Sequence, residues 1–356
     1  MLTAPWRPLL AAVFALVVIV ICSGCSDKNQ LESNWQTYIT RLSRVLDRSP
    51  ASKALDSQAS FPRQRGLTMS FTAININLVE FLSMRHCALR ETISQRNSIL
   101  GKHGDASARL IFDLRFLNQA QDCIHQLTDE GNHKLAIELQ QAVKIKTREL
   151  PARLFSASIG GPEFRELWQP PPSLDHYPTK GDDPSIIALA RWSQWQHQWL
   201  NGNWQHDSDA ILSTLGEIRL GGGGSLLKAQ RLAVTKLHDA SSIINQRIST
   251  RPLCLTGSPT PAAKQFQNVL LSQFIAKIQQ QASLINHHQY ALMSQVESIE
   301  DELLSAMRKH ELHTPPSYIS WQHERKTLLK EAMLAHRQHV EIAGELLSQC
   351  GLSPAD

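Results

Sequence analysis

The sequence predicts an all-α protein, an elongated bundle of antiparallel helical hairpins that ends in a long coiled-coil-like hairpin. Apolar residues recur every three or four positions along most of the chain, as on one face of an α-helix. Glycine and proline clusters separate these segments, and no segment alternates apolar and polar residues as a half-buried strand does. The expected helices cover residues 31–48, 68–100, 105–127, 133–150, 185–200, 207–220, 225–249, 262–307 and 318–348.

Local signals set the ends of the first helices. Ser49-Pro50 ends the first helix, and Gly101 suits the position just after the second. Asp105 or Ser107 can cap the third helix, which a turn near residue 104 folds back against the second. These three helices therefore begin and end at residues that favour helix termini.

Residues 160–184 are expected to form a hinge between two helical regions. Prolines at positions 162, 170–172, 178 and 184 break any regular element there. The hinge divides the chain into an N-terminal region, 31–159, and a C-terminal region, 185–356. The glycine run 221–224 is expected to be a flexible turn, since no Gly-Lys-Ser or Gly-Lys-Thr of a phosphate-binding loop follows it.

The last two helices are expected to pair as a hairpin. Pro315-Pro316 separates them, and the chain should turn near His313. Apolar residues of the first of these helices follow steps of three and four, which suit a coiled-coil-like seam. The seam consists of Leu271, Phe274, Ile278, Ile285, Leu292, Val296, Ile299, Leu303 and Met307.

The N-terminus has the pattern of an export signal. Arg7 precedes an apolar run, 9–21, of roughly 13 residues, shorter than the roughly 20 that span a bilayer. Ser23-Gly24-Cys25 resembles the lipobox of bacterial lipoproteins, so residues 1–24 are expected to be removed and Cys25 to carry a diacylglycerol thioether and an acylated amine. Residues 25–30 would be a tether. A plain signal peptide and a transmembrane anchor are the alternatives.

Sorting to the outer membrane, with the body in the periplasm, is expected by the same resemblance, because Ser26 stands where an aspartate is the usual inner-membrane retention signal. In that oxidising compartment four further cysteines would form disulfides. A hairpin turn near residue 104 brings Cys87 level with Cys123, and a fold-back before residue 262 lets Cys254 reach Cys350. Spacing alone leaves the other connectivities open.

Three short segments carry a family resemblance. They are YITRLSRVL at 38–46, RNSILGK at 96–102 and RPLC at 251–254. Together they resemble the gammaproteobacterial lipoprotein family described as domain of unknown function 3080. The resemblance would cover nearly the whole mature chain, and it implies a coherent architecture without any activity to carry over.

Arg96, Asn97 and Ser98 form a polar cluster near the end of an otherwise apolar helix. One hypothesis is a site for a ligand or a partner. The alternative is a hydrogen-bond network that satisfies the last carbonyl groups of the helix, and this reading is favoured.

Trp192, Trp195 and Trp199 follow one another at steps of three and four residues. Such a stripe could stack on the sugar rings of a periplasmic glycan such as peptidoglycan. The same spacing suits a face buried against another helix, and this alternative is favoured.

His336 and His339 lie one helical turn apart, and His287 or His288 could face them across the hairpin. A transition-metal site is geometrically possible. Histidines without carboxylates at fixed spacing are more often surface residues, so no metal and no cofactor are expected.

Composition and motifs point away from several functions. The chain has 36 basic and 32 acidic residues, intermixed, for a net charge of +4, which does not favour nucleic acid. No nucleophile elbow, paired carboxylates or zinc-peptidase spacing stand out, so an enzyme is not expected. The leading hypothesis is a non-enzymatic, membrane-anchored structural or adaptor protein that binds an envelope protein or the cell wall, peptidoglycan. The alternative is a glycan- or small-ligand-binding module, or a cell-wall enzyme, using the tryptophan stripe or the Arg96 region.

Overall fold

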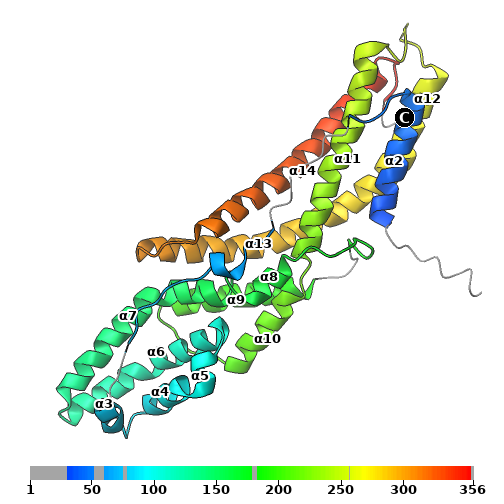
Figure 1. Cartoon of the computed structure of the whole chain (residues 1–356). Coiled ribbons are helices and arrows are strands. Elements are labelled where there is room, and N and C mark those ends of the chain that lie inside the picture. The colour runs from blue at the N-terminus through cyan, green and yellow to red at the C-terminus, as the bar shows by residue number, and fades with distance from the viewer. Residues whose placement is uncertain (1–29, 52–59, 75–77, 179–182, 256, 354–356) are drawn as a thin grey trace, which may run out of the picture.

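The computed structural model describes residues 30–51, 60–74, 78–178, 183–255 and 257–353, and across these residues it is built of helices without strands (Figure 1). The prediction of an all-α fold is confirmed. Residues 1–29, and with them the expected signal and Cys25, lie outside the described residues. The α-helices are α2 (Gln30–Leu46), α3 (Leu78–Ser83), α4 (Leu89–Asn97), α5 (Ile99–His103), α6 (Ala106–Asp129), α7 (His133–Ala157), α8 (Pro162–Leu167), α9 (Pro184–Leu200), α10 (Ser208–Arg219), α11 (Gly223–Thr250), α12 (Pro261–Val269), α13 (Gln280–Lys309) and α14 (Pro316–Ser348). A 3-10 turn, η1 (Gln64–Gly66), and a π-helical segment, η2 (Leu270–Gln279), complete the list.

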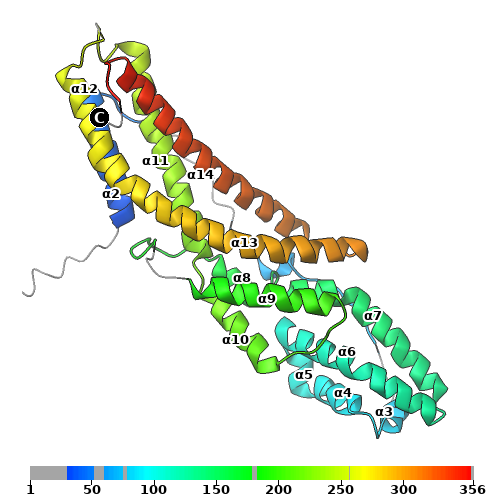
Figure 2. The ribbon, with the colours of Figure 1, turned by 180° about the vertical axis from the view of Figure 1, so that it is seen from behind.

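The helices form two groups joined along a long continuous helix. Figures 1 and 2 show α2, α11, α12 and α14 in the upper group, and α3 to α7 with α10 in the lower group. The path α12–η2–α13 runs from the upper group across the middle of the molecule, where α13 packs on α9. The molecule is accordingly elongated, as expected from its long hairpins.

Helix α2 packs on α11, α12 and η2, although it comes before the lower group in the chain. Its Tyr38 hydroxyl lies 2.7 Å from Nε2 of His339 on α14. The first helix of the expected N-terminal region therefore lies with helices of the expected C-terminal region. The boundaries of the two regions stay a prediction.

Glu300 of α13 and Arg325 of α14 form a buried ion pair where the two groups meet. Their side chains are 1% and 0% exposed, and the two nitrogens Nη1 and Nη2 lie 2.8 and 2.7 Å from the two carboxylate oxygens. Tyr318 and Gln322 also donate hydrogen bonds to Glu300. Burial alone would raise the pKa of Glu300, but Arg325 and these donors hold it below its usual value.

Aromatic rings enclose this pair. The guanidinium carbon of Arg325 lies 5.1 Å from the ring centre of Trp168 and 4.8 Å from that of Trp321. Phe155 of α7 meets Tyr318 edge to face at 5.5 Å. Residues from α7, the segment after α8, α13 and α14 thus pack around one pair of charges.

One helix was expected over residues 68–100, and this prediction is wrong. Residues 68–74 lie outside any helix and form a segment without regular secondary structure, and α3, α4 and α5 follow as separate short helices. The side chain of Glu149 accepts hydrogen bonds from both the backbone N–H and the hydroxyl of Thr72, which replaces helical bonding there. The helix is interrupted again at Ser98, whose hydroxyl accepts a hydrogen bond from the N–H of Gly101 and thereby caps the start of α5.

The expectations for the proline-rich segment and the glycine run also need correction. Residues 162–167 form α8, so regular structure does occur inside 160–184. Gly223 and Gly224 begin α11, and a Cβ at either would collide with the segment that follows α8, at Gln169 in the case of Gly224. Lys228 donates to the carbonyl oxygens of residues 171 and 172. The glycines therefore permit close packing of two segments rather than a flexible turn.

Both expected disulfides are present, Cys87–Cys123 and Cys254–Cys350. The first ties the turn before α4 to α6, and the second ties the segment after α11 to the end of α14. The expected pairing of the last two helices as a coiled-coil-like hairpin is wrong: the chain turns between α13 and α14 as predicted, but Figures 1 and 2 show α14 diverging from α13 and running along α11. Within the described part of the chain, no helix has the length and apolar character needed to cross a membrane.

Replacing Arg325 by Met should lower the free energy of unfolding by about 3–5 kcal/mol, because it leaves the Glu300 carboxylate buried without its cation. The double variant Glu300→Gln, Arg325→Met should recover most of this loss. Arg337→Met, at an exposed ion pair with Glu341, is the matched control and should cost about 0.5 kcal/mol or less. Urea unfolding followed by circular dichroism measures all three, and equal losses for Arg325→Met and the double variant would contradict the assignment.

Candidate functional site

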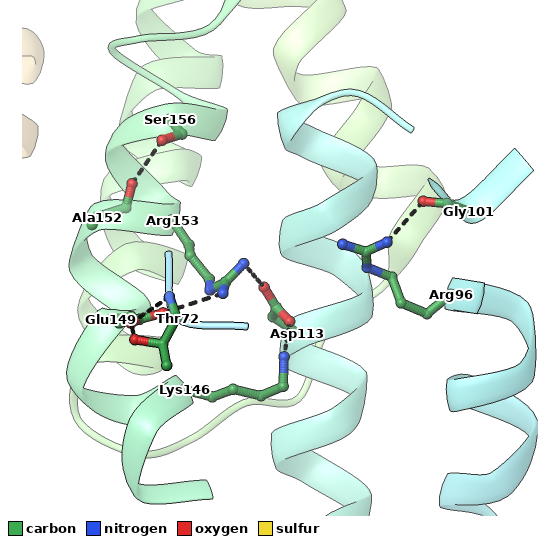
Figure 3. Close-up of polar contacts among 9 residues, drawn as sticks. All are labelled: Thr72, Arg96, Gly101, Asp113, Lys146, Glu149, Ala152, Arg153 and Ser156. Carbon is green, nitrogen blue, oxygen red and sulfur yellow. Dashed lines mark hydrogen bonds and ion pairs between the residues drawn. The ribbon is translucent and has the colours of Figure 1, made fainter. Parts of the chain in front are cut away.

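The candidate site is a cleft of about 390 Å³ that lies over α6, with α7 and residues 71–74 of the extended segment before α3 on one side and α4 on the other (Figure 3). Its size lies within the range of small-molecule sites. We call it the basic-aromatic cleft, since its wall combines cations with phenylalanine rings. The residues that define it are Phe71, Arg96, Arg109, Phe112, Asp113, Phe116, Lys146 and Arg153.

A buried ion-pair network forms the floor of the cleft. Asp113 of α6 is 4% exposed, accepts a hydrogen bond from Lys146 and forms an ion pair with Arg153, whose Nη1 lies 2.8 Å from its Oδ2. Arg153 also reaches Glu149, with 3.3 Å between Nη2 and Oε2. Oε1 of Glu149 in turn accepts hydrogen bonds from Thr72, with 3.0 Å to the backbone nitrogen and 2.5 Å to the hydroxyl oxygen. Figure 3 shows these groups in one chain of contacts from α6 through α7 to the extended segment.

Helix geometry explains why these side chains converge. Helices α6 and α7 pack together as a hairpin, and residues 146, 149 and 153 lie on the face of α7 that meets α6. Steps of three and four residues place side chains on one side of a helix. The three polar side chains of α7 therefore point toward Asp113 and the extended segment.

Cations of the cleft lie against phenylalanine rings. The guanidinium carbon of Arg153 is 4.2 Å from the ring centre of Phe71, and Nζ of Lys146 is 5.0 Å from that of Phe116. Burial lowers the pKa of Lys146, Asp113 opposes this effect, and the nearby charges of Arg153 and Arg96 lower it further. Several positive charges are thus held close together in a partly dry environment.

The structure divides the predicted polar cluster of Arg96, Asn97 and Ser98 between two roles. Arg96 and Asn97 line the cleft. Ser98 ends one helix and caps the next, as the helix-end alternative proposed. Arg96 also donates to the carbonyl oxygen of Gly101, at 3.1 Å from Nη1.

The ion-pair network itself was not predicted from the sequence. Asp113 lies between Leu110 and Leu114 on a largely apolar face, and Lys146 and Arg153 recur on the inner face of the next helix. A charged residue within an apolar helical stripe is the signal that could have found them, because a buried charge requires a partner. A charged residue of this kind does not by itself identify the residue with which it pairs.

The tryptophan stripe does not form an open platform. Trp192 and Trp199 are 0% and 1% exposed, and their rings meet edge to face at 5.8 Å. Trp195 is half-buried and packs against Trp199. Because these rings pack against the core and one another, the stripe presents no open surface on which a sugar ring could stack.

The four histidines considered for a metal are not brought together. His339 is buried between the Tyr38 hydroxyl at 2.7 Å and the Ser241 hydroxyl at 3.1 Å, and burial lowers its pKa to about 3. His336 lies near the carbonyl oxygen of Ala332. Among the described residues, no group of three or more His, Cys, Asp or Glu side chains could hold a metal ion.

His288 takes part in a second polar cluster instead. Its Nδ1 lies 2.9 Å from the hydroxyl of Tyr177, and its Nε2 lies 3.0 Å from Oδ2 of Asp183. Asp183 also accepts from the N–H groups of Gly222 and Ser185. Burial tends to raise the pKa of Asp183, but these hydrogen bonds bring it down to about 2. The cluster joins the proline-rich segment to α11 and α13.

The fold and the cleft define an all-α protein with two disulfides and a cavity between its helices that is lined by cationic and aromatic side chains. Residues 35–354 match the family described as Protein of unknown function (DUF3080), so the chain belongs to this family. No curated protein and no solved structure matches the chain.

Replacing Asp113 by Asn should lower the free energy of unfolding by about 2–4 kcal/mol, because Lys146 and Arg153 lose their shared carboxylate. Asp122→Asn is the matched control, since Asp122 is an exposed residue of the same helix. Urea unfolding monitored by circular dichroism gives both values. Equal stabilities of the two variants would show that the network contributes nothing to the fold.

The Asp183 cluster predicts a dependence of stability on pH. Its folded pKa, about 2, is below the ordinary value of 3.8, so the ionised carboxylate stabilises the folded state. This contribution is complete above about pH 4 and is lost as the pH falls toward about 2. The difference in urea midpoint between the wild type and Asp183→Asn should therefore shrink over this interval, and a difference that stays constant with pH would contradict the assignment.

Proposed function

We propose that this protein is a non-enzymatic lipoprotein of the bacterial envelope, anchored through Cys25 in the outer membrane with its helical body in the periplasm. The body acts as an adaptor that binds an envelope protein or peptidoglycan. The observation that carries the proposal is the lipobox-like Ser23-Gly24-Cys25 at the end of an export signal. Acyl chains on this cysteine would supply stable attachment, since each buried methylene contributes about 0.8 kcal/mol.

The two disulfides support an oxidising compartment. Cys87–Cys123 and Cys254–Cys350 account for every cysteine beyond residue 25. Disulfides persist in the periplasm and are rare in the cytosol of mesophiles. The body is therefore suited to the environment to which the proposed anchor would deliver it.

The basic-aromatic cleft supports binding as the task of the body. Asp113, Lys146, Glu149 and Arg153 are paired with one another, so the network holds the shape of the cavity. Preorganised polar groups around an apolar cavity are typical of binding sites. A rigid cleft on a tethered helical body suits the capture of a partner or ligand in the envelope.

The anchor can be tested by changing Cys25 to Ala, with Cys22→Ala as the matched control because Cys22 lies within the expected signal. The wild type and Cys22→Ala should fractionate with the outer membrane and begin at an acylated Cys25 in mass spectrometry. Cys25→Ala should lose the acyl mass and this fractionation, because no cysteine remains at the lipidation position. A wild-type mature chain that starts elsewhere without acyl groups would refute the anchor.

The adaptor role is tested by affinity capture from solubilised envelopes with the wild type and Cys25→Ala as bait. Peptidoglycan fragments and envelope proteins are both identified in the eluate. Enrichment of one specific component with the anchored bait supports the proposal. Recovery of no specific envelope component would count against it.

A further inference from the structure

We infer that the basic-aromatic cleft binds a small amphipathic anion, a carboxylate or phosphate monoester on an apolar body, with Arg96 and Arg109 as its cationic partners. This inference rests on the proposed function, in that it takes the body to be a binding protein, and it names the ligand class. The two acids share one chemistry, a compact anion, and the experiment below separates them.

The charge balance of the cleft favours an anion. Its wall contains four cations, Arg96, Arg109, Lys146 and Arg153. Asp113 pairs with Lys146 and Arg153, and Glu149 pairs with Arg153. Within the described residues, neither Arg96 nor Arg109 has a carboxylate at ion-pair distance, and each donates instead to a backbone carbonyl oxygen. Two positive charges of the wall are therefore left without an anionic partner.

Two further observations concern the nitrogen donors of the wall. Nε of Arg153 is buried and has no hydrogen-bond acceptor in the described part of the protein. A buried donor without an acceptor is costly, so its presence beside a cavity points to a ligand that accepts the bond. Burial and the neighbouring charges of Arg153 and Arg96 also disfavour the charged form of Lys146, and an anion in the cleft would relieve this repulsion.

The apolar part of the ligand follows from the rest of the wall. Phe71, Phe112 and Phe116 face the same cavity as the cations. A second cavity of about 220 Å³ shares Phe71, Arg109, Asp113 and Arg153 with the first and continues along Leu67, Met69 and Leu110. An inorganic anion would leave these apolar surfaces uncovered, whereas an acid with a hydrocarbon body would cover them. The shared residues place the cations between the two apolar walls.

Neither arginine of the proposed pair is needed for the ion-pair network. Asp113 forms its ion pairs with Lys146 and Arg153, and Arg109 is an exposed residue that donates a hydrogen bond to the carbonyl oxygen of Lys102. Replacement of Arg109 should leave the fold intact and remove a ligand contact. Arg148, exposed on α7 and absent from both cavity walls, provides the matched control.

The experiment is isothermal titration calorimetry of the full-length protein in zwitterionic nanodiscs, with empty nanodiscs as the blank. The probes are octanoate, monooctyl phosphate, 1-octanol and inorganic phosphate. We expect octanoate or monooctyl phosphate, whichever acid the cleft prefers, to bind at least about tenfold more tightly than 1-octanol and inorganic phosphate, because only the amphipathic acids use both walls. Binding of both acids no tighter than 1-octanol would overturn the inference.

The variants test the residues. The single variant Arg109→Gln should lower the affinity for the preferred acid by about tenfold or more, and the double variant Arg96→Gln, Arg109→Gln should lower it by about tenfold or more again. Arg148→Gln should leave this affinity unchanged. Thermal unfolding shows whether each variant is folded. If the double variant does not fold, the affinity of the single variant Arg109→Gln decides whether the assignment of the arginines holds. Equal affinity in Arg109→Gln and Arg148→Gln would overturn the assignment. A negative result in these titrations would reject only the proposed ligand class. The anchor and the adaptor role are tested separately, by mass spectrometry and by affinity capture.

Discussion

The buried pair of Glu300 and Arg325 is the constraint on which the arrangement of the helices depends. Both charges are removed from water, so each requires the other, and the bidentate contact fixes how α13 and α14 lie near their turn. Trp168, Tyr318 and Trp321 pack around the guanidinium and connect it to the segment after α8 and, through Phe155, to α7. From this point α13 continues across α9 while α14 diverges to pack along α11 (Figure 1).

The basic-aromatic cleft uses similar chemistry with a different balance of charge. At the junction, one carboxylate and one guanidinium match, and aromatic rings enclose them. In the cleft, Asp113 and Glu149 pair with Lys146 and Arg153, while two more arginines of the wall have no carboxylate partner among the described residues. The balanced pair suits a structural role, because it leaves no charge to attract a ligand. The unbalanced and open cluster suits recognition of an anion.

Only two of the fourteen residues that line the cleft were predicted from the sequence. Arg96 and Asn97 stood out because polar residues ended an apolar helix, and both line the cleft. Asp113, Lys146 and Arg153 did not, because Asp113 lies on α6 and both of its cationic partners lie on α7, so these pairs form only when the two helices pack. The extended segment at Thr72 was taken for helix, since apolar spacing favoured it and the competing hydrogen bonds come from Glu149, distant in sequence.

The sequence by itself determined the all-α class and the extents of most long helices, and it favoured the two disulfides without excluding other pairings. These features depend on periodicity and end signals that act over a few residues. Tertiary structure alone decided that α2 joins the last helices, that α14 packs along α11, and that the glycines at 223 and 224 permit a close contact. Apolar stripes specify that a helix must be covered but not by which helix, because that choice depends on shape and charge at residues far apart in the chain.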